Sequence, residues 1–153
     1  MDINEKRTPK RGETQMVPQR VKDETGLVQV DTTWGIIQPM QVAENVRTVD
    51  EIEVNDWLGK GHQVIDGRTP DFYNKSTIPG AINIPHTQIV ERMDELNGVQ
   101  PAIFFCNGPQ CPQSPTAIHN LLEAGYPPEK ILYYRGGMHN WVTLGLPVEN
   151  KKQ

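Results

Sequence analysis

The stretch from Ala102 to Gly125 constrains the fold more than any other part of the chain. It opens with an apolar run, Ala102 to Phe105, whose residue types favour a buried strand. Ser114 is a good N-cap and Pro115 suits the first helical position. Apolar side chains then recur at helical spacing until Gly125, a plausible stop. The order of strand, polar loop and helix predicts one unit of an α/β fold.

A cysteine, Cys106, stands where this strand ends and the polar loop begins. At a turn into a helix, backbone N–H groups can converge on a sulfur or an anion, and the helix dipole favours negative charge there. Both effects lower the pKa of a thiol and increase the fraction of thiolate, its reactive form. The position indicates a reactive cysteine; the alternative is a buried, inert cysteine of the core.

Other short apolar runs alternate with helical patterns along the chain. The further strands that we expect are Gln63–Asp66, one within Ile78–Pro85, and Ile131–Tyr134. Such alternation with short connections predicts an α/β domain whose parallel sheet is covered by helices on both faces.

Start and stop signals place the shorter helices. Thr48 with Glu51 fits a capping box, and Ile52 would lie on the core face of the helix that follows. A last short helix carries Trp141 and is expected to end at Gly145. A further amphipathic helix is predicted from Thr87 to Leu96, with these side chains directed inward: Ile89, Val90, Met93 and Leu96.

Polar residues come directly after three of the predicted strands: Asp66 and Arg68, Cys106, and Arg135. Ligand sites of open α/β sheets lie at the carboxyl ends of the strands. The convergence of these residues at one edge of the sheet therefore predicts a site there.

Composition narrows the possible functions. The chain has 153 residues, enough for one domain with a core, and its net charge of -4 at pH 7 indicates no basic face for nucleic acid. No apolar run reaches the length of a transmembrane helix, so no membrane partner is expected. The two cysteines do not form a disulfide framework and fit a reducing compartment, so we expect a cytoplasmic protein.

The chain divides into four segments. Residues 1–25 are polar and dense in charge, as in a flexible tail. Residues 26–47 contain scattered apolar side chains such as Trp34, and we expect an extended segment that packs on the domain; the alternative is a lid over the site. The domain itself is expected at residues 48–148, followed by a C-terminal tail at residues 149–153.

Several motifs together resemble the signatures of rhodanese-like domains. They are Val64–Tyr73 followed by Ile78–Pro85, then Phe105-Cys106 before a loop and helix, and finally Tyr134–Trp141. The resemblance runs from Thr48 to Val148. It implies a single domain around a parallel five-stranded sheet, with no metal or organic cofactor. Active members of this family are sulfurtransferases: their cysteine takes a sulfane sulfur from a small donor such as thiosulfate, holds it as a persulfide and passes it to cyanide or a thiol. By position, that cysteine here is Cys106.

The chain also departs from the family pattern. Its loop from Asn107 to Gln113 has no charge, whereas many active members carry a basic residue near the end of that loop. An anionic donor such as thiosulfate then lacks a direct ion partner, unless Arg68 or Arg135 supplies one, and each of these can equally be structural. The loop from Cys106 to Ser114 is also about two residues longer than the short loop of the sulfurtransferases, and in length it resembles that of phosphatase relatives. Those relatives require an arginine at the end of the loop, where this chain has Pro112 and Gln113, which argues against a phosphatase.

The residues expected to bind substrate are Arg68, Arg135 and the loop residues Asn107, Gly108, Pro109, Gln110, Cys111 and Pro112. Cys111 either fills the lengthened loop or acts as a resolving thiol for Cys106. The spacing of the two cysteines is not that of a metal site. The sequence therefore predicts a sulfurtransferase that moves a sulfane sulfur from thiosulfate or a persulfide donor to a thiol or cyanide through Cys106. The alternatives are a thiol redox enzyme using Cys106 and Cys111, or an inactive binding or regulatory module. The oligomeric state and the physiological donor and acceptor do not follow from the sequence.

Overall fold

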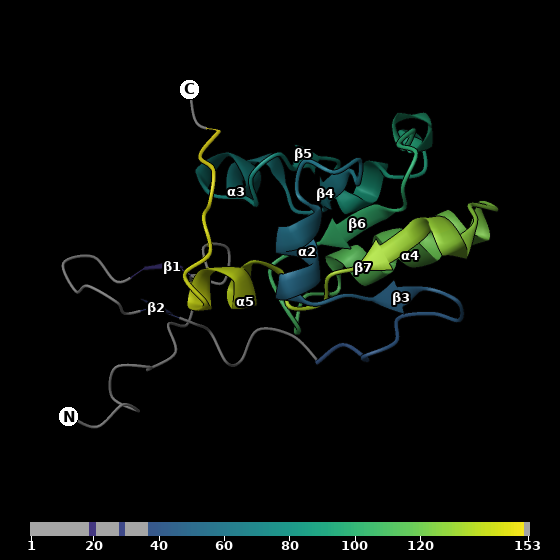
Figure 1. The fold of residues 1–153 in the computed structure, drawn as a ribbon. Coiled ribbons are helices and arrows are strands. Elements are labelled where there is room, and N and C mark those ends of the chain that lie inside the picture. The colour runs from purple at the N-terminus through teal and green to yellow at the C-terminus, as the bar shows by residue number, and fades with distance from the viewer. Residues whose placement is uncertain (1–18, 21–27, 30–36, 152–153) are drawn as a thin grey trace.

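Five parallel strands form the sheet of this domain, as the fold prediction required. The computed structural model describes residues 19–20, 28–29 and 37–151. The strands are β3 (Arg47–Thr48), β4 (Val64–Asp66), β5 (Ile82–Asn83), β6 (Ala102–Phe105) and β7 (Ile131–Tyr133), in the spatial order β3-β7-β6-β4-β5. The strand that leads to Cys106 is thus the central one, with β4 and β7 on either side (Figure 1).

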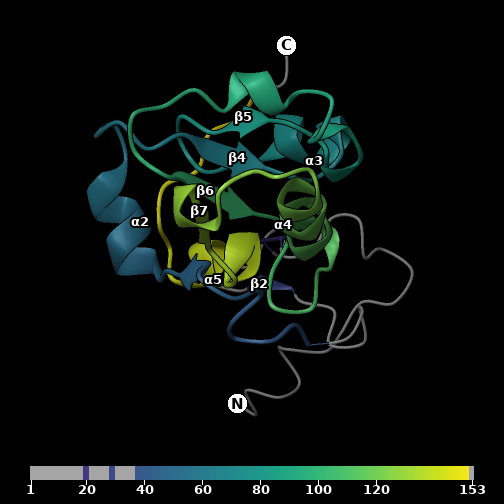
Figure 2. The same ribbon diagram turned by 90° about the vertical axis from the view of Figure 1, so that its right-hand side faces the viewer.

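Helices cover both faces of this sheet. The α-helices among the described residues are α2 (Glu51–Trp57), α3 (Pro70–Lys75), α4 (Gln113–Glu123) and α5 (Gly137–Thr143). Short 3-10 helices are η2 (His86–Gln88), η3 (Met93–Glu95) and η4 (Pro128–Lys130). Figure 2 shows α2 and α4 on opposite sides of the sheet, the arrangement of a parallel α/β domain.

Two apolar clusters form the core, one on each face of the sheet. Alternate residues of β6 point to opposite sides, so Phe104 belongs to the cluster under α4 and Phe105 to the cluster under α2 and α5. Ile118 and Leu121 of α4 are fully buried in the first cluster. Trp141 of α5 is fully buried in the second. Because both faces are buried, β6 and β7 read as uninterrupted apolar runs, and β4 is apolar up to Asp66, its last residue.

The predicted start of the first helix is wrong by two residues. Thr48 belongs to strand β3, where it pairs with Tyr133 of β7. The capping box is formed by Asp50, whose side chain accepts from the N–H of Glu53 while the Glu53 carboxylate accepts from the N–H of Asp50. The shift changes the buried face of the helix: Ile52, expected in the core, is 73% exposed.

The predicted cap of the central helix is also wrong. Helix α4 begins at Gln113, and its N-cap, Pro112, makes no side-chain hydrogen bond. Ser114 lies inside the first turn, and its backbone N–H donates to the sulfur of Cys106. The cysteine sulfur therefore satisfies a first-turn donor that helices commonly satisfy with a capping side chain.

The helix predicted from Thr87 to Leu96 is wrong as a regular element. The segment is a series of tight turns that includes η2 and η3, with mostly i to i+3 hydrogen bonds such as Leu96 N–H to Met93 O. Ile89 is buried as expected, but Val90 is 43% exposed. The Gln63 side chain holds the C-terminal end of this segment. It donates to Glu95 O and accepts from Gly98 N–H, which fixes the segment against the start of β4.

The segments outside the sheet are described in part. Strands β1 (Gln19–Arg20) and β2 (Val28–Gln29) pair antiparallel, and Trp34 lies outside the described residues. Val42 is buried in the cluster under α4, and its carbonyl contacts Nε2 of His119. Near the C-terminus, Glu149 forms an antiparallel bridge with Thr77. No helix within the described part of the chain is long and apolar enough to cross a membrane.

Candidate active site

The carboxyl ends of β4, β6 and β7 bring the predicted site residues together. Asp66, the last residue of β4, pairs in register with Phe105, which precedes Cys106. Arg68 from the loop after β4 reaches across and donates to Oδ1 of Asn107 at 3.2 Å. The convergence that the sequence predicted at this edge is present for the β4 and β6 loops.

Cys106 is a buried thiol at the bottom of the site, with 2% of its surface exposed. Its sulfur accepts the N–H of Ser114 at 3.4 Å, and its own S–H donates to Cys111 O at 3.6 Å. The hydroxyl of Ser114 is buried and has no other partner among the described side chains and backbone. A hydroxyl hydrogen rotates to suit its acceptor, so this group is available to a thiolate at Cys106.

The surroundings lower the pKa of Cys106 although the thiol is buried. Burial by itself raises the pKa, because it disfavours the thiolate, and the carboxylate of Asp66 acts in the same direction. Hydrogen bonds from the Cys111 thiol and from the N–H and hydroxyl of Ser114 outweigh this and lower it. Cys106 is therefore the more readily ionised thiol of the site.

Cys111 has the opposite character. It is fully buried, and its pKa is strongly raised by burial, by its hydrogen bond to Cys106 and by the charge of that neighbour. Its thiol also donates to Oε1 of Gln113 at 3.5 Å. Cys111 is thus a protonated donor beside Cys106, and both cysteines are free rather than joined in a disulfide.

The start of helix α5 holds the loop from the other side. The N–H groups of Met138 and His139 donate to the carbonyls of Cys106 and Asn107 at 3.0 and 2.7 Å. Gly137 makes this contact possible: its φ is +57°, and a Cβ there would lie 2.4 Å from the carbonyl oxygen of Cys106. A glycine is therefore required for α5 to approach the cysteine.

Arg68 forms a buried network with Asp66. Its Nε and terminal nitrogen donate to both carboxylate oxygens at 2.8 to 3.2 Å, and the same terminal nitrogen donates to Ser76 O at 2.6 Å. Asp66, which is fully buried, also accepts from the hydroxyl of Thr77 and from the backbone N–H of Arg68. Arg68 thus links the β4 loop to Asn107, and a role in substrate binding stays a prediction.

Arg135 lies at the end of β7, half-buried, and contacts a segment outside the predicted motifs. Its Nε donates to the carbonyl of Gln38 at 2.9 Å. The N–H of Gln38 in turn donates to Pro109 O in the cysteine loop at 2.7 Å. The main chain of Gln38 therefore bridges the loop and Arg135.

The other predicted loop residues frame the same region. Asn107 and Gly108 are buried, and the carbonyl of Gly108 accepts the N–H of Cys111 at 2.9 Å in a tight turn. Pro109 and Gln110 are half-buried, and Pro112 is exposed at the helix start. Their contact with a substrate stays a prediction. The described residues contain no group of three or more His, Cys, Asp or Glu side chains able to hold a metal ion.

The sequence does not predict three of the contacts around Cys106: those of the Ser114 hydroxyl and N–H, of the Gln38 main chain, and of Gly137. Ser114 suits a helix cap by residue type, and a main-chain contact such as that of Gln38 does not depend on residue type. Gly137 carried a usable signal, because paired glycines after a strand are typical of a close backbone approach.

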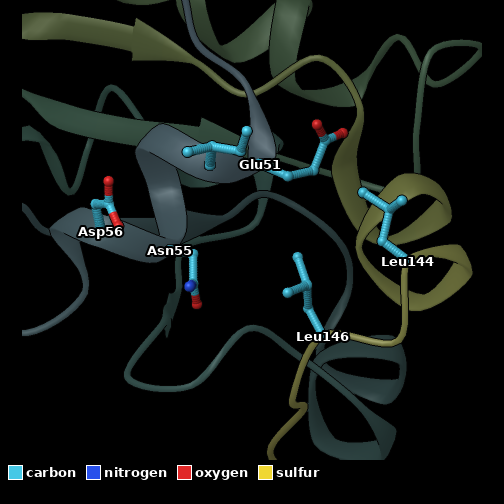
Figure 3. Close-up of a pocket in the computed structure, with 6 residues that line it drawn as sticks. Glu51, Asn55, Asp56, Leu144 and Leu146 are labelled. Carbon is cyan, nitrogen blue, oxygen red and sulfur yellow. The ribbon is translucent and has the colours of Figure 1, made fainter.

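A separate shallow hollow lies between α2 and α5. It has a volume of about 170 Å³ and is lined by Glu51, Ile52, Asn55, Asp56, Leu144 and Leu146. Figure 3 shows Glu51 and Asp56 on helix α2 and both leucines on the segment opposite. The Glu51 carboxylate accepts from the Tyr134 hydroxyl at 3.2 Å, so this hollow adjoins the reverse side of the β7 end rather than the cysteine.

The fold and the site define a class: a parallel α/β domain with a buried cysteine, its pKa lowered, at the end of its central strand. The model of the rhodanese-like domain family matches residues 50–144. The chain belongs to the rhodanese-like domain family, as its motifs indicated.

Relatives that match this chain are named for different functions. A sulfurtransferase of Allochromatium vinosum is 31% identical over 105 residues, which are 67% of this chain and 94% of that protein. An HTH-type transcriptional regulator of Mycobacterium tuberculosis is 34% identical over 86 residues, or 56% of this chain, but this chain spans only 37% of the regulator's length. The domain therefore occurs both in sulfurtransferases and within a regulator.

Solved structures agree on the fold. A thiosulfate sulfurtransferase from Pseudomonas aeruginosa has a TM-score of 0.61 and 27% identity, with 71% of this chain and 21% of that one covered. A Bacillus halodurans protein has the same TM-score of 0.61 at 24% identity, with 69% and 77% covered, and shows the fold alone.

Proposed function

We propose that this protein is a sulfurtransferase in which Cys106 carries the sulfur as a persulfide. The thiolate of Cys106 attacks the sulfane sulfur of a donor, a new S–S bond forms, and the bond to the rest of the donor breaks. With a persulfide donor, the departing group is the donor's thiolate. In the second half-reaction an acceptor thiolate or cyanide attacks the terminal sulfur, and the Cys106 thiolate leaves.

The observation that carries this proposal is the Ser114 N–H directed at the Cys106 sulfur at 3.4 Å, a contact between two buried residues. Together with the Cys111 thiol it lowers the pKa of Cys106 against the effect of burial. The same donors favour the anionic persulfide that forms after transfer. The modest identity to proteins named sulfurtransferases is consistent with this chemistry.

We further propose that the donor is a thiol persulfide rather than thiosulfate. The loop from Asn107 to Gln113 is uncharged. Arg68 is committed to the buried carboxylate of Asp66, and Nε of Arg135 is bound to the Gln38 carbonyl. Among the described residues at these positions, a dianionic donor would meet one guanidinium bound to a backbone carbonyl rather than to an acid, that of Arg135, whereas a thiol persulfide carries at most one negative charge on its sulfurs and needs less compensation.

Steady-state transfer to cyanide tests the proposal. Thiocyanate formation is measured with thiosulfate and, separately, with glutathione persulfide as donor, for the wild type, Cys106→Ser and Cys111→Ser. We expect a higher kcat/KM with the persulfide, no turnover with Cys106→Ser, and turnover retained in Cys111→Ser. Turnover lost in Cys111→Ser would favour the thiol redox enzyme that uses both cysteines.

A regulatory or binding module is the second candidate, favoured by the presence of this domain in the M. tuberculosis regulator. It predicts a Cys106 that neither accepts sulfur nor reacts below the pH at which a free thiol ionises. The lowered pKa of Cys106 points the other way. A pH profile of Cys106 alkylation separates the two candidates without knowledge of the donor.

A further inference from the structure

The proposed transfer needs only one of the two buried cysteines. Cys111 is fully buried, although its neighbours in the loop are half-buried Gln110 and exposed Pro112. Its thiol donates to Gln113 Oε1 at 3.5 Å, and its presence beside Cys106 lowers the pKa of that cysteine. A second buried thiol beside Cys106 is a candidate for a step of its own in the chemistry of this site.

The backbone fixes the second thiol beside the first. The N–H of Cys111 bonds to Gly108 O at 2.9 Å, closing a turn that folds the loop back over Cys106. As a result the Cys111 carbonyl lies 3.6 Å from the Cys106 sulfur. The main chain of Cys111 therefore lies against the Cys106 sulfur, and a sulfur added to Cys106 is formed beside this residue.

We propose that Cys111 resolves the Cys106 persulfide, releasing hydrosulfide and leaving a Cys106–Cys111 disulfide. This inference rests on the proposed sulfurtransferase function and assigns a second outcome to the same persulfide. The domain would then act as a dithiol sulfide-releasing enzyme whenever no external acceptor takes the sulfur first.

The step balances without an outside oxidant. The Cys111 sulfur attacks the inner sulfur of the persulfide, the bond to the terminal sulfur breaks, and that sulfur leaves with the electron pair. The Cys111 proton goes to the departing sulfur, so an anionic persulfide and a thiol become a disulfide and HS⁻. The sulfane sulfur is reduced and the two cysteine sulfurs are oxidised. A dithiol reductant restores the two thiols for the next cycle.

Cys111 starts the step as a protonated thiol, because burial raises its pKa. The thiolate rather than the thiol is the nucleophile, so Cys111 gives up its proton as it attacks, and the departing sulfur takes that proton. The hydroxyl of Tyr133 is buried and lacks a partner among the described residues. Burial raises its pKa and a charge on Cys106 raises it further, so it remains a protonated O–H donor.

Proximity favours Cys111 over an external thiol. With Cys106 2% exposed and Cys111 fully buried, an outside acceptor must first open the loop, whereas Cys111 already lies beside Cys106, its carbonyl oxygen 3.6 Å from that sulfur. A correctly oriented intramolecular group can act as if present at about 10⁵ M or more. A disulfide requires the two sulfurs to come to about 2.0 Å, so the Cys111 thiol must leave Gln113 and turn toward Cys106.

The test follows the sulfur in the absence of an acceptor. Wild type, Cys111→Ser and Cys111→Ala are loaded anaerobically with one equivalent of glutathione persulfide, passed through a desalting column and incubated. Released hydrosulfide is trapped and quantified, and each protein is examined by intact mass and peptide mapping. Circular dichroism establishes that each variant is folded.

We expect the wild type to release hydrosulfide in step with the sulfur loaded, and to end two hydrogens lighter than the reduced chain, with Cys106 joined to Cys111. Both variants should keep the added sulfur and release none. A wild type that holds its persulfide as long as the variants do overturns the inference but leaves the proposed function intact. Folded variants that never gain sulfur contradict the proposed function instead. If neither variant folds, the wild-type result alone decides: a stable persulfide overturns the inference.

Discussion

The backbone N–H of Ser114 donates to the sulfur of Cys106 at 3.4 Å, linking the first turn of helix α4 to the end of the central strand. The Ser114 hydroxyl has no hydrogen-bond partner among the described residues and can rotate toward the same sulfur when the thiol ionises. The Cys111 thiol and these two donors of Ser114 lower the pKa of Cys106, whereas the charged side chain that acts on it, that of Asp66, raises it.

The first prediction concerns the pH dependence of Cys106. Since the folded protein lowers the pKa of this thiol, its alkylation rate should level off at a lower pH than that of a free cysteine, about 8.5. Because the Cys111 pKa is raised, Cys111 should stay protonated and react slowly throughout. Iodoacetamide kinetics with peptide mapping give both profiles. A Cys106 midpoint at or above the free-thiol value contradicts the prediction.

Ser114→Ala should move that profile upward. The variant keeps the N–H but loses the hydroxyl, a hydrogen bond to a charged group worth about 1.5–3 kcal/mol, which is about 1–2 pH units. Thr116→Ala is the matched control, since Thr116 lies exposed on the same helix. Equal profiles for the two variants would show that the Ser114 hydroxyl does not act on Cys106.

Loss of Arg68 should destabilise the domain severely. Arg68→Gln leaves the fully buried Asp66 carboxylate without its charge partner, an effect of about 3–5 kcal/mol on the free energy of unfolding. Urea denaturation measures the change. Arg92→Gln, which breaks a solvent-exposed pair with Glu95, should leave the unfolding curve unchanged. Similar curves for Arg68→Gln and the wild type would mean that the buried pair is not formed in solution.

Two glycine substitutions separate conformational strain from a steric clash. Gly80 and Gly137 both have positive φ, but a Cβ at Gly80 meets nothing within 4 Å, whereas one at Gly137 lies 2.4 Å from Cys106 O. Gly80→Ala should cost about 1 kcal/mol. Gly137→Ala should cost more and also displace the cysteine loop, seen as a changed Cys106 alkylation rate. The prediction fails if Gly137→Ala keeps that rate.

The main chain of Gln38 should restrain access to the site. Gln38→Pro removes the N–H that bonds to Pro109 O, while Gln38→Ala retains it. Losing a hydrogen bond of about 1 kcal/mol should speed loop opening, and hence Cys106 alkylation, by about fivefold in the proline variant only. Equal rates in both variants would show that this contact does not limit access.

The sheet and its reactive edge were predictable because they depend on residue type. Strands buried on both faces appear as apolar runs, so β6 was predicted with its observed bounds and the site followed from what comes after each strand. The helix starts were less predictable. Thr48 and Ser114 both suit a cap by residue type. Thr48 instead pairs with Tyr133 in the sheet, and the N–H of Ser114 donates to the Cys106 sulfur.

The parts of the site that sequence did not reveal are made by backbone and by distance. Gln38 donates through its backbone N–H, a group that every residue except proline has, so residue type does not reveal this contact. The opposite pKa shifts of Cys106 and Cys111 arise from burial and mutual contact, which their spacing alone does not specify.

Intact-mass spectrometry after a single loading tests the central claim most directly. Wild type and Cys106→Ser are incubated briefly with glutathione persulfide and, separately, with thiosulfate, and are then treated with cyanide. We predict one added sulfur on the wild type from the persulfide, or the disulfide that follows it, with any added sulfur removed by cyanide and no change in the serine variant. Sulfur uptake by neither donor, or equal uptake by Cys106→Ser, would contradict the assignment of Cys106 as the sulfur carrier.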